Sequence, residues 1–571
     1  MTIRESLEAV LYQALSSAVQ AGALPLEEVP QPTLERPREE GHGDWACTVA
    51  MRLAKAARMN PRQIAQILVD NLPENELIET VEIAGPGFIN LTLANSVFQN
   101  VIAEVRAQGS DYGKSTLPKP CKVDLEYVSA NPTGPMHVGH GRWAALGDSI
   151  ARVMRHAGYD VDEEFYINDQ GNQMNVFADS LVVRYQQALG QDVEMPEASY
   201  GGGYVKELAQ QIIDRDGDKW LSVDPDERRH EFREMGYKAM MENVKETLEI
   251  FGNHFDTWFS ERSLFVADEE GKTKIDRAFE VMKDKGYIFE QDGATYFRST
   301  AFGDEKDRVL IKTNGELTYF MSDVAYHYDK MQRGYDHLID IWGADHHGYI
   351  PRCQAMMAAW GYPDALEVVL GQLVTLFRDG QQVRMSKRTG EMITFRELID
   401  EVGVDATRYM MLSKSSDQSI DFDIEVAKKK DASNPVYYVQ YAHARICSIL
   451  RKAAQARGIE TEGVSVTELV EALSITNADL SVLTHESELE LMRKMADFTD
   501  LVAGAARDRA PFRLTHYAQD LAALFHSFYT NCRVIGEGEQ LEQARLALAD
   551  SARIVLALAL GLLGVSAPEH M

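Results

Sequence analysis

Two histidines at helical spacing are the first residues in this sequence that could do chemistry. His137 and His140 lie in the stretch 131–142, between period-two alternation at 122–128 and helical spacing at 143–156. Such a strand-to-helix turn offers backbone N–H groups and the helix dipole to an anion. Imidazole N–H groups can add hydrogen bonds to phosphate oxygens. An ordinary turn with surface histidines has the same pattern, so this stretch alone leaves both interpretations open.

A lysine in a short loop is the second candidate group. Met385, Ser386 and Lys387 follow a buried-looking strand at 368–377, and the loop ends at Gly390. A lysine supplies a point charge to a polyphosphate, and a glycine-terminated loop can close over it. The two turns together favour a nucleotide site, in which Gly139 lets a base or ribose approach the backbone.

Carboxylates lie beside the predicted pocket. Asp124 and Glu126 share one face of the strand at 122–128, although either could face solvent, and Asp323 lies much further along the chain. A guanidinium substrate requires carboxylates arranged for fork-like hydrogen bonds. At the end of another strand, Gly343 and Asp345 place a carboxylate where it can accept hydrogen bonds from ribose hydroxyls.

The composition restricts the class of protein. A formal charge of −30 argues against sequence-blind binding to nucleic acids, which needs a cationic surface, but it allows a specific RNA partner at a local basic patch. The five cysteines are scattered, without Cys-x-x-Cys spacing, so we expect reduced thiols and no structural zinc. No signal peptide is evident, and the longest apolar run, 554–565, is too short to span a bilayer. We expect a cytoplasmic protein that does not enter the membrane.

The hydrophobic patterns divide the chain into parts. Residues 1–112 combine helices at 3–21 and 60–72 with strands at 81–83 and 88–93, which predicts a small α/β domain. From residue 113 to 395 the strand–helix–strand order predicts a Rossmann-like, doubly wound parallel sheet. Its strands are expected at 122–128, 160–167, 294–298, 308–312, 336–342 and 368–377, with a helical insertion at about 187–263.

The end of the chain is predicted to be all α-helix. A connecting segment at 396–430 leads to a helical bundle at 431–571, with helices at 436–456, 467–473, 485–505, 515–529 and 539–563. Three lysines at 428–430 precede Tyr438 and Tyr441. Basic residues beside aromatic rings can stack RNA bases, but tyrosines packing into their own bundle are at least as good an interpretation of these residues.

The order of the two turns resembles the catalytic domain of class I aminoacyl-tRNA synthetases over about 123–390. His-Val-Gly-His at 137–140 is similar to the family's His-Ile-Gly-His signature, and Met-Ser-Lys-Arg at 385–388 to its Lys-Met-Ser-Lys-Ser signature. Arg384 and Arg388 depart from that second signature, whereas Lys387 matches its phosphate-binding lysine. The resemblance implies amino-acid activation by ATP with Mg²⁺.

Within that class the chain most resembles the arginyl-tRNA synthetases of bacterial type. Residues 126–135, Glu-Tyr-Val-Ser-Ala-Asn-Pro-Thr-Gly-Pro, and the Tyr-x-x-x-Asp pattern at 319–323 carry the resemblance. It implies that Ser129, Asn131 and His140 hold the backbone groups of arginine, and that Glu126, Tyr319 and Asp323 hold its side chain. ATP is expected at His137, Gly139, His140, Gly343, Asp345, Met385, Ser386 and Lys387, with catalysis by His137, His140 and Lys387.

The resemblance covers nearly the whole chain and implies partners. The first 112 residues correspond to the family's domain for the tRNA elbow, and 431–571 to its anticodon-binding domain, with tRNA contacts at Tyr438, Tyr441 and Met571. The expected reaction ligates L-arginine to tRNA(Arg) through an arginyl adenylate, releases AMP and diphosphate, and requires bound tRNA for activation. A monomer is expected.

Three other classes of protein share some of these sequence features. A class I synthetase for glutamate would need basic pocket residues, and one for cysteine a zinc-binding cysteine set. A small-molecule nucleotidyltransferase shares His-x-Gly-His but does not need the long helical end. A non-enzymatic tRNA-binding paralogue would be free to lose His137, His140 and Lys387, and all three are present.

Overall fold

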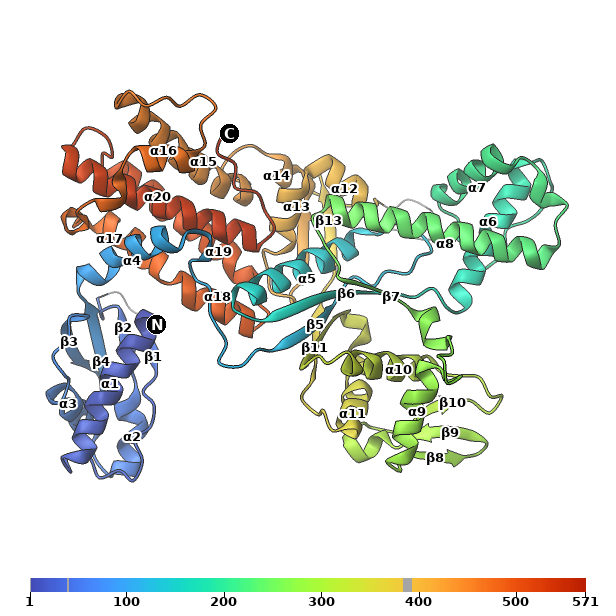
Figure 1. Ribbon diagram of the computed structural model, residues 1–571, viewed down its shortest axis with the longest axis horizontal. Helices are drawn as coiled ribbons and strands as arrows, with labels where there is room; N and C mark the ends of the chain where they lie inside the picture. Colours follow the sequence, from blue (N-terminus) through green and yellow to red (C-terminus); the bar gives the residue numbers. More distant parts are fainter. Residues whose placement is uncertain (1, 38–40, 384–392) are drawn as a thin grey trace.

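The computed structural model describes residues 2–37, 41–383 and 393–571. Figure 1 shows three regions: a sheet with helices at the N-terminus, a central sheet with its helices and two projecting lobes, and a helical C-terminal region. None of the helices in these described ranges is both long enough and apolar enough to cross a membrane. This arrangement confirms the predicted fold class.

The N-terminal domain is a four-stranded antiparallel sheet covered by helices, and the sequence analysis predicted two of its strands, at 81–83 and 88–93. Its strand order is β1 (Leu34–Glu35), β2 (Trp45–Cys47), β4 (Phe88–Leu93) and β3 (Ile78–Ala84), and its helices are α1 (Ile3–Gln20), α2 (Val49–Ala57) and α3 (Pro61–Asp70). Helix α1 begins with a capping box in which Thr2 and Glu5 satisfy each other's backbone N–H groups.

The following helix, α4 (Asn95–Gln108), lies on the C-terminal helices instead of the N-terminal sheet (Figure 1). Its Arg106 side chain donates to the backbone oxygen of Ile475 at 2.9 Å and pairs with Asp550 at 3.3 Å. Beyond the helix, the Tyr112 hydroxyl donates to the oxygen of Met495 at 3.0 Å. The compact N-terminal unit therefore ends before α4, earlier than the expected residue 112.

The central sheet is parallel and has five strands, with β5 in the middle. Its order is β12 (Leu366–Gly371), β11 (His337–Gly343), β5 (Lys122–Glu126), β6 (Asp160–Ile167) and β7 (Thr257–Ser260). From β5 the chain passes through α5 (Val138–His156) to β6 on one side, and β11 pairs with β5 on the other. The strand order reverses at β5, which is where ligands bind in sheets of this kind.

Two predicted strands of this sheet belong to another. The segments at 294–298 and 308–312 form β9 (Ala294–Phe297) and β10 (Arg308–Ile311), which make a separate antiparallel sheet with β8 (Ile288–Gln291). The cause is local. Asp292 and Gly293 have φ of 51° and 77° and close a two-residue hairpin between β8 and β9, so the chain cannot make the crossover that parallel strands require.

This small sheet and three helices form one lobe. The helices are α9 (Lys274–Asp284), α10 (Tyr319–Gln332) and α11 (Ile350–Trp360), and they share a hydrophobic core with the antiparallel strands. Helix α10 packs its buried face, which includes Met321, Val324 and Ala325, into this core. The lobe thereby places α10 beside the central strands.

The predicted insertion is a helical arm, although its bounds differ from 187–263. It consists of α6 (Asn172–Ala188), α7 (Gly203–Asp216) and α8 (Pro225–Ile250), which have a hydrophobic core of their own and project to one side in Figure 1. The arm begins with α6, and the sheet resumes with β7 at Thr257. The sequence analysis did not predict the four-residue strand β7.

The predicted strand at 368–377 is two strands. It breaks after Gly371, and β13 (Val374–Arg378) leaves the central sheet to pair with β14 (Gln381–Gln382) and β15 (Ile420–Asp423). In the sequence, α12 (Phe395–Val402) and α13 (Val404–Met411) lie between β14 and β15, and α14 (Ile424–Lys428) follows β15. The connecting segment therefore contains a strand that the sequence analysis did not predict.

The C-terminal region is a helical bundle, as predicted. Its helices are α15 (Pro435–Ala456), α16 (Val466–Ala472), α17 (Glu486–Ala496), α18 (Phe498–Arg507), α19 (Phe512–Asn531) and α20 (Glu539–Leu562). The single helix expected at 485–505 is two helices that meet at Asp497. The core of the bundle is continuous with that of the central sheet and of the N-terminal domain.

One buried arginine joins the bundle to the central domain. The Arg408 side chain on α13 is fully buried and forms an ion pair with Asp148 of α5. Its guanidinium also donates to the backbone oxygens of Phe251 at 2.8 Å and Leu563 at 3.0 Å. Those two oxygens follow α8 and α20, so a single side chain holds four helices in place.

Candidate active site

The chain turns sharply between β5 and the histidine turn. Val128 and Ser129 have φ of 68° and 41°, a region that costs a branched residue such as valine on the order of 1–3 kcal/mol. The turn directs the Ser129 hydroxyl back to Glu126, to whose Oε1 it donates at 2.9 Å. The Ser129 hydroxyl oxygen in turn accepts from the backbone N–H of Tyr166 at 3.1 Å. Two predicted arginine-binding residues are thus joined directly.

The two histidines lie at the start of α5. His137 is the N-cap residue, and its backbone N–H donates to Nδ1 of His140 at 3.2 Å. The rings are stacked with centroids 3.7 Å apart. A Cβ at position 139 would come within 2.9 Å of the His137 ring, so Gly139 leaves room for this stacking. The helix therefore begins inside the predicted turn and not at residue 143.

The described chain returns to this turn at Thr394. Thr394 forms a β-bridge with His137, and the backbone N–H of Phe395 donates to the oxygen of Met136 at 2.8 Å. A Cβ on Gly141 would come within 2.2 Å of the Phe395 ring. Met385, Ser386 and Lys387 lie outside the described residues, but the chain that follows them is fixed beside His137.

Arg142, one helical turn along α5, ties the turn to more distant loops. Its guanidinium is buried and donates to the backbone oxygens of Gln372 at 2.6 Å, Ser415 at 2.9 Å and Gln418 at 2.7 Å. Burial lowers the pKa of Arg142 to about 10. The segment between β12 and β13 and the loop before β15 are therefore anchored to α5.

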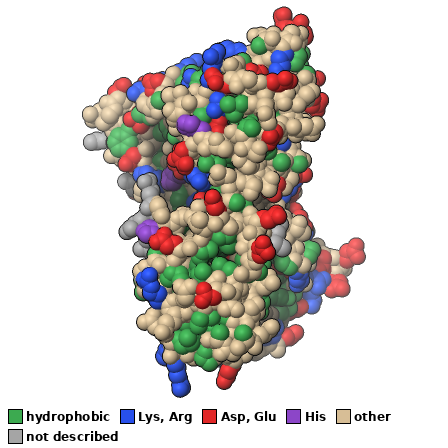
Figure 2. Space-filling view, turned by 90° about the vertical axis from the view of Figure 1, so that its left-hand side faces the viewer, with side chains coloured by type: hydrophobic (Ala, Val, Ile, Leu, Met, Phe, Trp, Pro, Cys, Tyr) green, Lys and Arg blue, Asp and Glu red, His purple; other side chains and the backbone are tan. Residues whose placement is uncertain are grey.

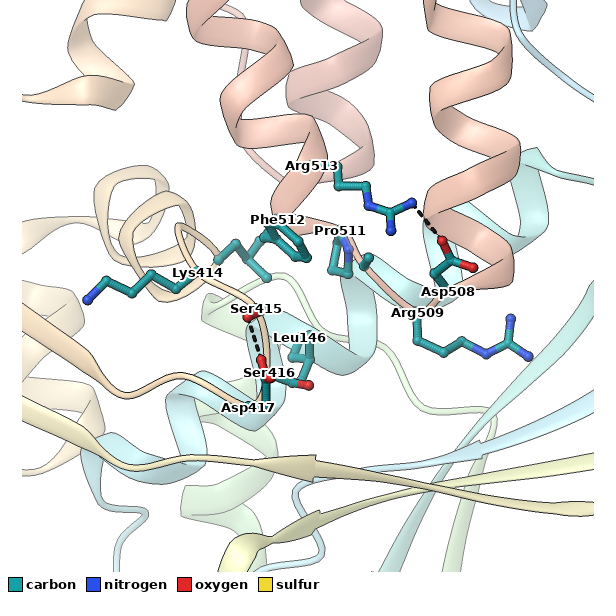
Figure 3. Close-up of a pocket in the computed structure, with 12 residues that line it drawn as sticks. Leu146, Lys414, Ser415, Ser416, Asp417, Asp508, Arg509, Pro511, Phe512 and Arg513 are labelled. Atoms are coloured by element: carbon teal, nitrogen blue, oxygen red, sulfur yellow. Dashed lines mark hydrogen bonds and ion pairs between the residues drawn. The ribbon is translucent and has the colours of Figure 1, made fainter. Parts of the chain in front are cut away.

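Behind this anchor is a cavity of about 210 Å³ at the junction with the helical bundle. Figure 3 shows Leu146 of α5 and the loop of Ser415 to Asp417 on one side, and Pro511, Phe512 and Arg513 on the other. Arg513 is paired with Asp508 at 2.7 Å. The cavity does not contain any of the predicted site residues.

A buried lysine lies beneath the predicted arginine pocket. Nζ of Lys330, on α10, is 2.8 Å from Asp124, 2.9 Å from Glu126 and 3.1 Å from Asp340. Asp124 and Glu126 share a face, as predicted, and that face is turned to the protein interior. The side chains of Lys330 and Asp124 have no exposed surface, whereas 11% of the Glu126 side chain is exposed. Only Glu126 of this pair can contact a ligand.

Other residues of α10 complete a network of buried charges. The Tyr326 hydroxyl lies 2.9 Å from Oε2 of Glu126 and 2.5 Å from Glu164 and can donate its one proton to either, and Arg333, directly after the helix, binds Glu164 at 2.5 Å. His327 pairs with Asp340 at 3.0 Å. The network holds β5, β6 and β11 against one helix.

Asp323 lies on α10 close to this network. The pKa of its carboxyl is raised to about 6, mainly by burial; the nearby charges of Glu126 and Asp340 contribute to the rise, and His327 opposes it. Tyr319, by contrast, is 71% exposed at the start of the helix. The structure thus brings Glu126, Ser129 and Asp323 together, and it leaves Tyr319 open to solvent.

We expect the affinity for arginine to fall by about fourfold between pH 7.5 and pH 5.5, because the Asp323 carboxyl becomes neutral below its pKa of about 6. The effect on stability has the opposite sign: since the pKa is raised in the folded protein, this group favours folding more as the pH falls towards 3.8. Calorimetric titration with L-arginine at the two pH values measures the first effect. Asp323→Asn should bind arginine more weakly and should lose the change in affinity between the two pH values. An unchanged pH dependence in that variant would contradict the assignment of Asp323 to the arginine site.

Asn131, Gly343 and Asp345 lie at or after the ends of strands β5 and β11. Asn131 is exposed after the sharp turn, and Asp345 is 82% exposed in the short helix that follows β11. A Cβ on Gly343 would come within 2.5 Å of the Asp345 carboxylate, so glycine permits this position. Asp169, from a segment to which the sequence assigned no chemistry, accepts from the Ser260 hydroxyl at 2.6 Å and joins the ends of β6 and β7.

Tyr438, Tyr441 and Met571 lie on the helical bundle, away from the sheet. Tyr441 is 41% exposed, and the Tyr438 ring contacts His526 with centroids 5.2 Å apart. Met571 is 54% exposed at the end of a tail that Arg451 holds through the backbone oxygen of Glu569 at 3.1 Å. Figure 2 shows acidic and basic side chains interspersed over one face of the molecule, so the overall negative charge does not form one continuous acidic surface on that face.

Sequence reasoning missed Lys330, Tyr326, Arg142 and Arg408. One signal was available for the first two, because Asp323, Tyr326 and Lys330 are separated by three and four residues and share one face of a helix. Nothing in the sequence near Arg142 or Arg408 identifies their partners, which are backbone oxygens from distant segments and, for Arg408, also the Asp148 carboxylate.

Comparison with protein families identifies the class. The model "tRNA synthetases class I (R), catalytic domain" matches residues 101–448, around the sheet and its histidine turn. The chain is thus a class I aminoacyl-tRNA synthetase. "Arginyl tRNA synthetase N terminal domain" matches residues 4–93, and "DALR anticodon binding domain" matches 439–571. The chain belongs to the arginyl-tRNA synthetase family.

Individual relatives agree over the full length. The arginine–tRNA ligase of Heliobacterium modesticaldum is 46% identical, covering 100% of this chain and 99% of the relative, and that of Listeria welshimeri is 47% identical with 100% of both covered. The solved structure of Thermus thermophilus arginyl-tRNA synthetase has a TM-score of 0.75 over 100% of both chains at 24% identity. That structural likeness supports the fold, and the bacterial relatives confirm the predicted family.

Proposed function

We propose that the edge of the sheet between β5 and α10 is where this synthetase binds arginine and ATP. As a member of its family, the chain joins L-arginine to its cognate tRNA with ATP, through an arginyl adenylate, and releases AMP and diphosphate. The observation that carries the placement is the hydrogen bond from Ser129 to Glu126 beside Asp323, which gathers acceptors for a guanidinium at the reversal point of the sheet.

The proposed arginine site has two parts. Glu126 and Asp323 attract the guanidinium, and Tyr319 frames its pocket. Acceptors and donors for the α-amino and carboxylate groups are supplied by Ser129, Asn131 and His140. Because Glu126 is the exposed member of the buried carboxylate network, it can pair with the substrate while Asp124 stays bound to Lys330.

The proposed nucleotide site surrounds the start of α5. His137 and His140 donate to phosphate oxygens at the positive end of the helix dipole, and Gly139 leaves room for the nucleotide. Gly343 and Asp345 receive the ribose, and Met385, Ser386 and Lys387 contribute charge to the β- and γ-phosphates. The His137–Thr394 bridge supports this last assignment, because it ends the Lys387 segment beside the histidines.

The reaction depends on positioning the two substrates and on neutralising charge, and it needs no covalent intermediate with the enzyme. The arginine carboxylate attacks the α-phosphorus of ATP and diphosphate leaves, so holding the two substrates in line and offsetting the developing negative charge lower the barrier. Magnesium is proposed to arrive with ATP as part of the nucleotide substrate. Among the described residues, three or more His, Cys, Asp or Glu side chains are nowhere grouped so that they could hold a metal ion.

The tRNA is proposed to contact both ends of the chain. The N-terminal domain meets the tRNA elbow, and the bundle reads the anticodon region with Tyr438, Tyr441 and Met571. The stacked rings of Tyr437 and Tyr441, with centroids 6.2 Å apart, present an aromatic surface on which a base can stack. We propose that the protein is a cytoplasmic monomer.

The test is an ATP–pyrophosphate exchange assay over all twenty amino acids, with and without total tRNA. We expect exchange only when arginine and tRNA are both present, because activation is proposed to require the bound tRNA. Light scattering on the same sample checks the monomer. Exchange at full rate with any other amino acid would overturn the assignment of the pocket.

A further inference from the structure

Lys330 is an unusual side chain for its position. Within the described part of the chain it is the one lysine that is classed as buried, and its side chain has no exposed surface. A buried ammonium costs several kcal/mol in lost hydration unless it is paired and hydrogen-bonded, on the order of the stability of a whole domain. Its partners come from β5 (Asp124 and Glu126) and β11 (Asp340).

The contacts of Glu126 differ between its two oxygens. Oε2 accepts from the Lys330 ammonium at 2.9 Å; the Tyr326 hydroxyl is also 2.9 Å away, but its one proton is shared with Glu164, which is closer at 2.5 Å. Oε1 accepts from the Ser129 hydroxyl at 2.9 Å. Oε2 is therefore held by the Lys330 ammonium from α10, and Oε1 lies on the side of the sharp turn that follows β5.

We propose that Lys330 is a positioning residue for amino-acid selection: it holds Oε2 of Glu126 so that Oε1 alone faces the substrate guanidinium. This inference rests on the proposed arginine site. A guanidinium normally pairs with a carboxylate through two parallel hydrogen bonds. With Oε2 occupied, that geometry is not available at Glu126. The N–H groups of the substrate must divide between Oε1 of Glu126 and a second acceptor, and Asp323 is the carboxylate placed to be that acceptor.

Sharing the substrate's N–H groups between two carboxylates favours a broad planar cation. A guanidinium carries donors on separate nitrogens and can bridge two carboxylates, whereas an ammonium is a compact point charge. The groups that face Lys330 are Asp124 and Glu126 on β5, Glu164 on β6, Asp340 on β11 and Tyr326 on its own helix.

A simpler role for Lys330 is neutralisation of the buried carboxylates, and a pair of variants separates the two roles. Lys330→Met removes the ammonium but keeps a side chain of similar length. Lys330→Met/Asp124→Asn removes one charge of each sign, so the buried charge balance is restored while Oε2 of Glu126 still lacks the ammonium. Asp124→Asn alone is the matched control, because it leaves the Lys330–Glu126 contact in place.

The measurement is tRNA-dependent ATP–pyrophosphate exchange with the full chain, with separate KM values for arginine and ATP, alongside the urea midpoint of each variant. We expect KM for arginine to rise by about tenfold or more in both Met variants, since a hydrogen bond to a charged group is lost, and KM for ATP to change less than about twofold. Asp124→Asn should keep an arginine KM close to that of the wild type. The double variant should regain part of the urea midpoint that Lys330→Met loses.

Two results would overturn the inference. One is a double variant that recovers both the urea midpoint and the wild-type KM for arginine, since Lys330 would then act only through charge balance. The other is an equal rise in both KM values. Failure of the proposed arginine site itself is seen separately, because Asp323→Asn would then leave the KM for arginine at its wild-type value in the same assay.

Discussion

Replacing Lys387 by alanine is expected to lower the rate of adenylate formation by about 10²- to 10³-fold, the loss seen when one preorganised charge or donor is removed from a transition state. Negative charge develops on the leaving diphosphate, and the ammonium offsets it without any covalent step. The dissociation constant for tRNA should stay within about twofold, because the proposed tRNA contacts lie on the two terminal domains. Single-turnover exchange kinetics and a tRNA binding titration measure the two quantities.

Lys283→Ala provides the control for that loss of charge. Lys283 is exposed in the last turn of α9, outside the proposed nucleotide site, so its removal should leave exchange and tRNA binding unchanged. If Lys387→Ala weakened tRNA binding as strongly as it slowed exchange, the segment would belong to the tRNA site and the nucleotide assignment would be wrong.

The second large effect is expected at Arg408, where replacement by methionine should lower the free energy of unfolding by about 3–5 kcal/mol. The change removes the fully buried partner of the Asp148 carboxylate, which keeps the partly exposed Arg152, and it removes the donors to the backbone oxygens of Phe251 and Leu563. Urea denaturation followed by circular dichroism measures the loss.

The matched control is Arg533→Met. Its side chain is 73% exposed and its nearest acidic partner, Glu537, is 4.0 Å away, so the change should be within about 0.5 kcal/mol of zero. A loss below about 1 kcal/mol for Arg408→Met would mean that the four helices it touches are held together by their apolar contacts alone.

The sequence predicted those parts of the site that depend on local pattern. The strand before the histidine turn, the helix after it and the parallel strands β6 and β11 follow from period-two and helical spacing, and the structure confirms them. The face shared by Asp124 and Glu126 was also predicted from alternation, but alternation does not show which face is buried. That choice depends on α10, which follows β5 by nearly two hundred residues and brings Lys330 to both carboxylates.

The predictions failed where a local signal was misjudged or a partner was distant. Asp292–Gly293 is a strong hairpin signal, and its neglect placed β9 and β10 in the wrong sheet. The left-handed conformation of Val128 could not be predicted, because valine disfavours it and tertiary contacts impose it. Arg142 binds backbone oxygens, which every residue has, and Arg408 binds such oxygens and a carboxylate 260 residues away, so the sequence around each arginine does not identify its partners.

The position of α4 has a consequence for how the chain is made. Arg106 of α4 pairs with a residue 444 positions later, and the apolar face of α4, with Val97, Phe98 and Val101, is buried against helices that the ribosome produces last. At roughly 5–20 residues per second, about 20–90 s pass before those helices emerge. During synthesis the apolar face of α4 is thus exposed beside a folded N-terminal domain. We expect a nascent chain halted near residue 400 to be retained by chaperones through this helix.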